Sequence, residues 1–171
     1  MRSQHIRRSQ HVAVNAVQIA INGARKLSTD DVDGHVALLD RAYHDFITGA
    51  NCAAHWCSLA DTCGMARTLA GMGLGSGDEA DSIIDRANAA LKDSHDRHAT
   101  RGSWTLYADE IEALHWLIRL HTTQLRACSY SEFAQAFDLT AERARQALAV
   151  NAAPGATVTV GQFGAHQHDQ R

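Results

Sequence analysis

Apolar residues recur at steps of three and four positions through most of the chain between residues 28 and 150. This spacing places them on one face of an α-helix, whereas a half-buried strand would show strict alternation. The chain has a single proline, Pro154, so no proline interrupts a helix before the C-terminal end. The clearest case covers residues 28–48, where the repeating positions are Val32, Val36, Leu39, Tyr43, Phe46 and Ile47. The pattern predicts an all-α fold.

Capping residues and glycines divide this pattern into separate helices. Ser28 or Thr29 can accept hydrogen bonds from the first amides of a helix that ends near Gly49. Asn51 can cap a second helix that reaches about Met72, where the glycine-rich stretch "GLGSGDE" follows. These signals predict short connections between neighbouring helices.

Three more helices are expected downstream. Residues 78–98 form the third, whose apolar face carries Ala80, Ile83, Ile84, Ala87 and Leu91. The stretch "RGSWTLY" then reads as a loop, with Trp104 and Leu106 as anchors into the core. A fourth helix follows this loop. Ser129 and Glu132 have the spacing of a capping box, which predicts the start of a fifth helix. In that helix the apolar positions that keep step are Phe133, Phe137, Ala144 and Leu148.

We therefore predict a single-domain bundle of about five helices over residues 28–150, between a basic N-terminal arm (1–27) and a mobile C-terminal tail (151–171). A chain of 171 residues can bury enough core to fold without disulfides or metal. No run approaches the roughly eighteen apolar residues of a membrane helix, and no leader pattern is present. We expect a cytoplasmic protein with no membrane partner and with free thiols at Cys52, Cys57, Cys63 and Cys128.

The stretch "NCAAHWCSLADTC" gathers three cysteines and a histidine at residues 51–63. Cys52 and His55 share a helix face, but Cys57 lies roughly 140° round the helix from Cys52 and Cys63 about 16 Å along it. The four therefore cannot form one metal site. We expect no metal and no cofactor, with Cys57 packed in a stripe of small residues. Cys52 and Cys63 should be half-buried. The alternative is a metal-binding bundle that uses Cys52, His55, His95 and His98.

No motif indicates catalysis. Glu112 and His115 form a single E-x-x-H pair, whereas a di-iron bundle needs two pairs and two further glutamates. The stretch "GMGLGSG" lacks the lysine and the Ser/Thr of a phosphate loop and follows a helix rather than a strand. The serines have no nucleophile-elbow context. We predict that the protein is not an enzyme.

The fourth helix has apolar residues on two sides. One face carries Ile111, Leu114, Ile118, His121 and Leu125. Trp116 and Leu120 point nearly the opposite way. Such a helix is either central in its bundle or covered by another chain. Because aromatic anchors dominate interfaces, we assign Trp116 and Leu120 to binding of another protein or to self-association; the alternative is burial within their own chain.

Basic charge is concentrated at the N-terminus. Residues 1–26 contain no acidic residue, and their basic residues are Arg2, Arg7, Arg8, Arg25 and Lys26. Arginines and lysines can neutralise phosphates without reading bases, so nucleic-acid binding by this arm is an alternative function. The stretch "EFAQAFDLTAERARQAL" has the look of a helix-turn-helix, but its apolar step runs on unbroken and its turn lacks glycine, which favours one straight helix.

At "RGSWTLYADEIEALHWLIRLHTTQLRACSYSE", preceded by "AGMGLG", the chain resembles a loose group of small helical proteins encoded by bacteriophages and prophages of Gram-negative bacteria. Those proteins have a similar basic arm, a glycine turn, the Trp-Thr-Leu element and a helix with "LH" followed by "QL". The resemblance covers about residues 28–150. It implies a fold and a genomic setting but no catalytic residue. The sequence thus predicts a non-enzymatic helical interaction protein, a phage accessory or host-directed factor.

Overall fold

In a computed structural model of the protein, which describes residues 21–50 and 52–151, the chain is a single all-α domain. Five helices are fully described: α2 (Thr29–Ile47), α3 (Ala53–Gly71), α4 (Asp78–Arg101), α5 (Ala108–Ala127) and α6 (Tyr130–Asn151). Residues 21–24 are also helical. The predicted all-α bundle is confirmed. Within the described residues, no helix is long and apolar enough to cross a membrane.

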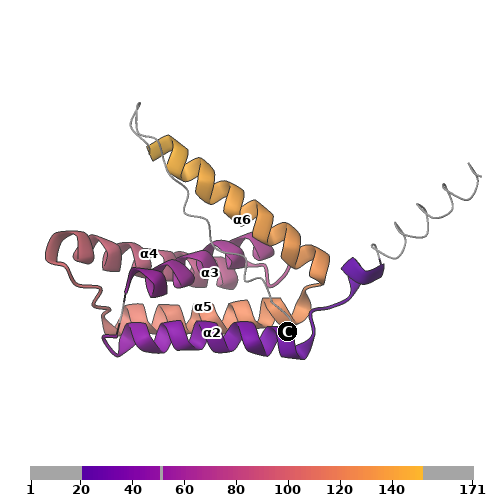
Figure 1. The fold of residues 1–171 in the computed structure, drawn as a ribbon, viewed down its shortest axis with the longest axis horizontal. Helices are drawn as coiled ribbons and strands as arrows, with labels where there is room; N and C mark the ends of the chain where they lie inside the picture. Colours follow the sequence, from indigo (N-terminus) through magenta and orange to yellow (C-terminus); the bar gives the residue numbers. More distant parts are fainter. Residues whose placement is uncertain (1–20, 51, 152–171) are drawn as a thin grey trace, which may run out of the picture.

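Four of the helices form a bundle, and the fifth leaves it. α2 and α5 lie side by side, and α3 and α4 lie next to them as a second pair (Figure 1). α3 contacts all four of the other helices, so it is the central element. α6 packs on α3 and runs obliquely away from the other helices (Figure 1). α6 thus lies outside the four-helix bundle and contacts it mainly through α3.

Most helix boundaries follow the capping signals in the sequence. The Ser28 hydroxyl accepts a hydrogen bond from the Asp31 amide at 3.1 Å. Ser129 and Glu132 form the predicted capping box, in which the Ser129 amide donates to the Glu132 carboxylate at 2.7 Å and the Glu132 amide donates to the Ser129 hydroxyl at 3.3 Å. Gly102 ends α4 in the left-handed conformation, which glycine adopts without a steric penalty.

Two boundaries differ from the prediction. The N-cap of α3 is Cys52 rather than Asn51, because the Cys52 carbonyl accepts the first helical hydrogen bonds, from the amides of His55 and Trp56. α4 continues three residues beyond His98, to Arg101. It extends because glycine, the residue that favours a stop, comes only at position 102.

The core consists of two clusters of buried side chains. The larger one joins α2, α3, α4 and α5 and includes Leu59, Ile84, Leu114 and Leu117. The smaller one joins α2, α3, α5 and α6 and includes Leu69 and Leu125. Trp104 is buried in the larger cluster and Leu106 packs against it, as the sequence predicted for the loop before α5. The predicted inner face of α4 is also confirmed, since Ile84, Ala87 and Leu91 are buried in the same cluster.

The expected burial of the cysteines on α3 was wrong. Cys57 is exposed, while Cys63 is 4% exposed and donates its thiol hydrogen to the Ile84 carbonyl. Apolar residues occur nearly all round α3, so the small-residue stripe did not determine the buried face. The larger Leu59 and Leu69 set it instead, because burying them removes more apolar area from water.

α6 is one uninterrupted helix, as predicted, and contains no helix-turn-helix. The expected apolar face along its length was wrong, however. Ala136 is buried and Phe133 is partly buried, whereas Phe137 and Ala144 are exposed, and the side chain of Leu148 is outside the described set. α6 has α3 as its main neighbour in the bundle, so only a narrow stripe of the helix is covered.

Candidate functional site: the groove between α2, α3 and α6

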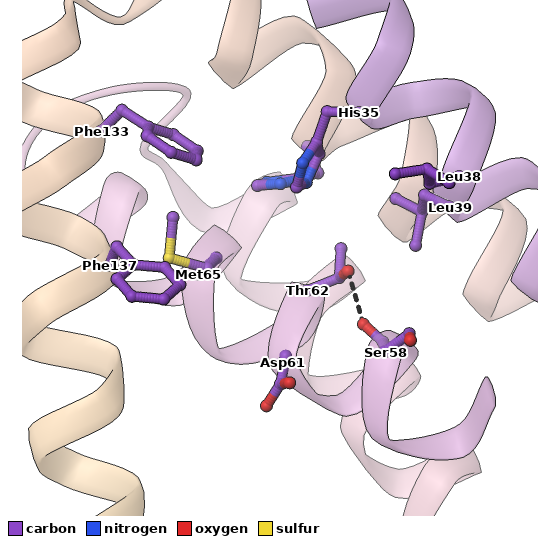
Figure 2. Close-up of a pocket in the computed structure, with 10 residues that line it drawn as sticks. His35, Leu38, Leu39, Ser58, Asp61, Thr62, Met65, Phe133 and Phe137 are labelled. Atoms are coloured by element: carbon purple, nitrogen blue, oxygen red, sulfur yellow. Dashed lines mark hydrogen bonds between the residues drawn. The ribbon is translucent and has the colours of Figure 1, made fainter. Parts of the chain in front are cut away.

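An apolar groove of about 440 Å³ runs between α2, α3 and α6 (Figure 2). We call it the α6 groove. Its lining residues are His35, Leu38 and Leu39 from α2, Ser58, Asp61, Thr62 and Met65 from α3, His121 from α5, and Phe133 and Phe137 from α6. The volume lies in the range of small-molecule sites in proteins, about 300 to 1,000 Å³.

Helical spacing aims these side chains at one another. Phe133 and Phe137 are four residues apart on α6, so both rings project from the same side of that helix. Figure 2 shows the two rings on one side of the groove and His35, Leu38 and Leu39 of α2 on the other. Thr62 and Met65 of α3 lie between them as the floor.

Two large apolar side chains at the groove are strongly exposed. Leu38 is 72% exposed and Phe137 is 59% exposed, the two highest values among the exposed large hydrophobic residues that the structure describes. They come from different helices and both line the same groove. Single exposed apolar residues are ordinary on protein surfaces, but apolar residues gathered around a concavity mark a binding site.

A buried histidine lies at the inner end of the groove. His121 is 1% exposed, and neither ring nitrogen has a hydrogen-bond partner within the described residues. Burial lowers the pKa of His121 to about 4 because the charged form loses its hydration; the neighbouring His35 lowers the pKa further when charged, and the nearby Gln124 side chain partly offsets both effects. His121 is therefore a neutral imidazole at pH 7, with one donor and one acceptor.

His35 covers His121 from the α2 side. The two ring centroids are 5.8 Å apart in an edge-on arrangement, and His35 also meets Phe133 at 6.1 Å. Partial burial lowers the pKa of His35 as well. Both imidazoles that line the α6 groove are thus biased toward the neutral form.

The remaining polar groups do not form a catalytic set. The Thr62 hydroxyl donates to the Ser58 carbonyl at 2.8 Å (Figure 2). The Ser58 hydroxyl donates to the Ala54 carbonyl at 3.0 Å, so both hydroxyl groups are satisfied within α3. Asp61 is the only acid or base other than the two histidines among the described lining residues. Burial raises its pKa. Within the described groove, no serine or threonine hydroxyl donates to a base.

The predicted metal alternative falls at another end of the bundle, where the histidines serve other contacts. The His98 ring stacks on Trp104 with 3.9 Å between centroids, and His95 packs on Trp56 at 5.3 Å. The His55 Nε2 lies 3.7 Å from an Asp45 carboxylate oxygen.

Cys52, the fourth residue of that alternative set, is exposed at the start of α3. Among the described residues, no group of three or more histidine, cysteine, aspartate and glutamate side chains could hold a metal ion.

The two residues assigned to partner binding have different surroundings. Leu120 is partly buried and packs against the core cluster, close to Gly75. Trp116 is 39% exposed; its Nε1 donates to Glu112 at 3.4 Å, and the Arg119 guanidinium lies 5.3 Å from its ring centroid. Partner binding by this surface stays a prediction, and Trp116 is the member that a partner could reach.

The described end of the basic arm lies against the start of α6. The Tyr130 amide donates to the Arg25 carbonyl at 2.9 Å, and the Leu27 amide donates to the Cys128 carbonyl at 3.3 Å. The side chains of Arg25 and Lys26 are exposed. The other three arginines of the predicted nucleic-acid surface, Arg2, Arg7 and Arg8, lie outside the described residues, as does the C-terminal tail beyond residue 151. Nucleic-acid binding stays a prediction.

Sequence reasoning missed the α6 groove. It placed His121 on the buried face of its helix, which is confirmed, but gave it no role. The signal available was a histidine at an otherwise apolar position, since a buried polar group needs a partner. Comparison of the chain with protein-family models, with curated proteins and with solved structures gave no match.

Proposed function

We propose that the protein is a non-enzymatic binding protein that holds an apolar ligand or partner segment in the α6 groove. The observation that carries this proposal is the exposure of Leu38 and Phe137 on facing rims of one apolar concavity. Because both side chains are already partly covered, burying the rest of each one contributes at most about 1.5 to 3 kcal/mol, which favours a bound state.

The polar groups of the groove support binding rather than catalysis. Its two hydroxyl groups are engaged with carbonyls of α3, and its buried imidazole has no hydroxyl or thiol nucleophile as a hydrogen-bond partner among the described residues. A general base must lie within hydrogen-bond reach of the proton that it removes. A few polar groups in a mostly apolar cavity are instead typical of a binding site.

The resemblance to small phage and prophage proteins suggests the biological setting of this binding. An accessory or host-directed factor acts by engaging another molecule, and a groove beside a diverging helix provides a surface for that. We place the protein in this class of phage factors as part of the same proposal.

The proposal can be tested with N-phenyl-1-naphthylamine, an uncharged dye that fluoresces in apolar sites. The wild-type protein should bind it at one site, and Leu38→Asp and Phe137→Asp should each weaken binding at least about tenfold, since each places a charge on the rim. Leu139→Asp is the matched control, because Leu139 is also exposed on α6 and does not line the groove.

Two results would contradict the proposal. One is saturable dye binding that Leu38→Asp and Phe137→Asp leave unchanged, because the dye would then occupy another surface. The other is no saturable binding by wild-type protein that is folded by circular dichroism. An equal loss in the Leu139→Asp control would show that general surface hydrophobicity, not the groove, binds the dye.

A further inference from the structure

His121 is the feature of the α6 groove that an apolar ligand alone would leave unexplained. A polar group buried without a partner costs stability, and neither His121 nitrogen has one within the described residues; the Oε1 atom of Gln124, one turn along α5, is likewise unpaired. Most buried polar atoms in proteins do have a partner, so each exception calls for one. A ligand that supplies this partner would recover part of the cost.

The groove gives that ligand a route to the imidazole. His121 lines the groove, but both of its nitrogens are shielded from solvent. The His35 ring lies edge-on against it from the exposed side of α2. Rotation of the His35 side chain away from His121 would uncover the imidazole ring on this side without any movement of the helices.

Charge limits what the ligand can carry. No lysine or arginine is among the described lining residues, and the Asp61 carboxylate is on the same groove, so an anionic ligand would be repelled. A cationic group would be drawn to Asp61, but Figure 2 shows Asp61 and His35 on opposite sides of Thr62. A cation held at Asp61 would thus leave the end of the groove nearest His35 and His121 unpartnered.

We propose that the α6 groove binds a neutral, apolar small molecule with one hydroxyl group, which hydrogen-bonds to His121 while the apolar body packs between Leu38, Phe133 and Phe137. This inference rests on the proposed function and adds the ligand class. A hydroxyl suits a neutral imidazole because it can either donate to the free nitrogen or accept from the N–H.

The test compares four probes that share one apolar body: 2-naphthol, naphthalene, 2-naphthoate and 2-naphthylmethylammonium. Each competes with N-phenyl-1-naphthylamine for the wild-type protein at pH 7.5. We expect 2-naphthol to bind about tenfold more tightly than naphthalene, the worth of one net hydrogen bond in a buried site. We expect naphthoate and the ammonium compound to bind more weakly than naphthol.

Variants of His121 test whether its side chain causes the preference for naphthol over naphthalene. His121→Phe should bind naphthol and naphthalene equally, because the ring remains and both hydrogen-bonding atoms are lost. His121→Gln retains a donor and an acceptor and should keep part of the preference. Since either variant could disturb the core, nitrogen NMR of the wild-type imidazoles provides a second measurement: naphthol should shift the His121 resonances and naphthalene should not.

His35→Ala tests whether His35 only covers His121 or itself binds the hydroxyl group. It should leave the preference for naphthol unchanged and bind all the neutral probes at least as tightly as the wild type, because the covering ring is gone. Weaker naphthol binding in His35→Ala, with His121 resonances that do not respond, would place the hydroxyl on His35 and overturn the inference.

The two proposals fail in different ways. Equal affinity for naphthol and naphthalene in the wild-type protein would overturn the hydroxyl inference and leave the groove as a binding site. Tightest binding of the ammonium compound would also overturn it, in favour of Asp61. Absence of saturable dye binding would remove the groove itself.

Discussion

Acidification should destabilise the protein through His121. Its pKa is lowered from 6.5 to about 4 in the folded state, so the unfolded chain binds a proton at a higher pH than the folded one. The stabilising effect of the neutral folded form is present above about pH 6.5 and is lost as the pH falls toward 4. With 1.36 kcal/mol per pKa unit, the expected loss is about 2 kcal/mol between pH 7 and pH 5.

The neighbouring titratable groups set the control. His35 on α2 also has a lowered pKa and adds to the loss, whereas burial raises the pKa of Asp61 on α3, which acts in the opposite direction at lower pH. Comparing the pH slope of the wild type with that of His121→Phe cancels both contributions to first order. His44→Gln, at an exposed position on α2, is the matched control and should retain the wild-type slope.

The assay is urea unfolding at pH 7, 6 and 5, followed by far-UV circular dichroism. The unfolding free energy of His121→Phe should depend on pH much less than that of the wild type, because phenylalanine fills the site and does not titrate. An equal pH dependence in His121→Phe and the wild type would refute the reasoning, whatever the variant does to absolute stability.

Two further predictions concern the core and the surface of the bundle. Cys63→Ala should lower the free energy of unfolding by about 1 kcal/mol or somewhat more, because Cys63 is buried. Cys57→Ala, at an exposed position, should change it by no more than about 0.5 kcal/mol. A larger loss in Cys57→Ala than in Cys63→Ala would mean that the buried face of α3 is assigned wrongly. Trp104→Ala should lower the free energy of unfolding by about 3 to 5 kcal/mol and leave the oligomeric state unchanged, because Trp104 is buried. Trp116→Ala should lower the free energy of unfolding by less. If partner binding uses Trp116, sedimentation analysis should show weaker association in Trp116→Ala alone.

Local signals in the sequence determined the helices. The first turn of a helix needs partners for its free amides, and Ser28 and the Ser129–Glu132 pair supply them through atoms within three residues. Likewise, the regular apolar spacing of α4 specifies its inner face, because one stripe is clearly more apolar than the rest. Such features need no knowledge of distant parts of the chain.

The local sequence pattern could not predict which face α3 buries. Its apolar residues surround the helix, and four other helices contact it, so the choice between Cys57 and Cys63 was made by the fit of its neighbours. The same holds for Phe137, whose spacing on α6 is that of a core residue. Only the divergence of α6 from the bundle leaves it exposed.

The α6 groove exists only in the tertiary structure. The sequence by itself determined that His121 would be buried, since it shares a helix face with Leu114 and Leu125. The packing of α2 and α6 around α3 then decided that its nitrogens would lack partners and that the His35 ring, itself in contact with Phe133, would lie against it. These contacts join residues far apart in the chain, and the free energy of such contacts depends on how whole helices pack, which no local pattern specifies.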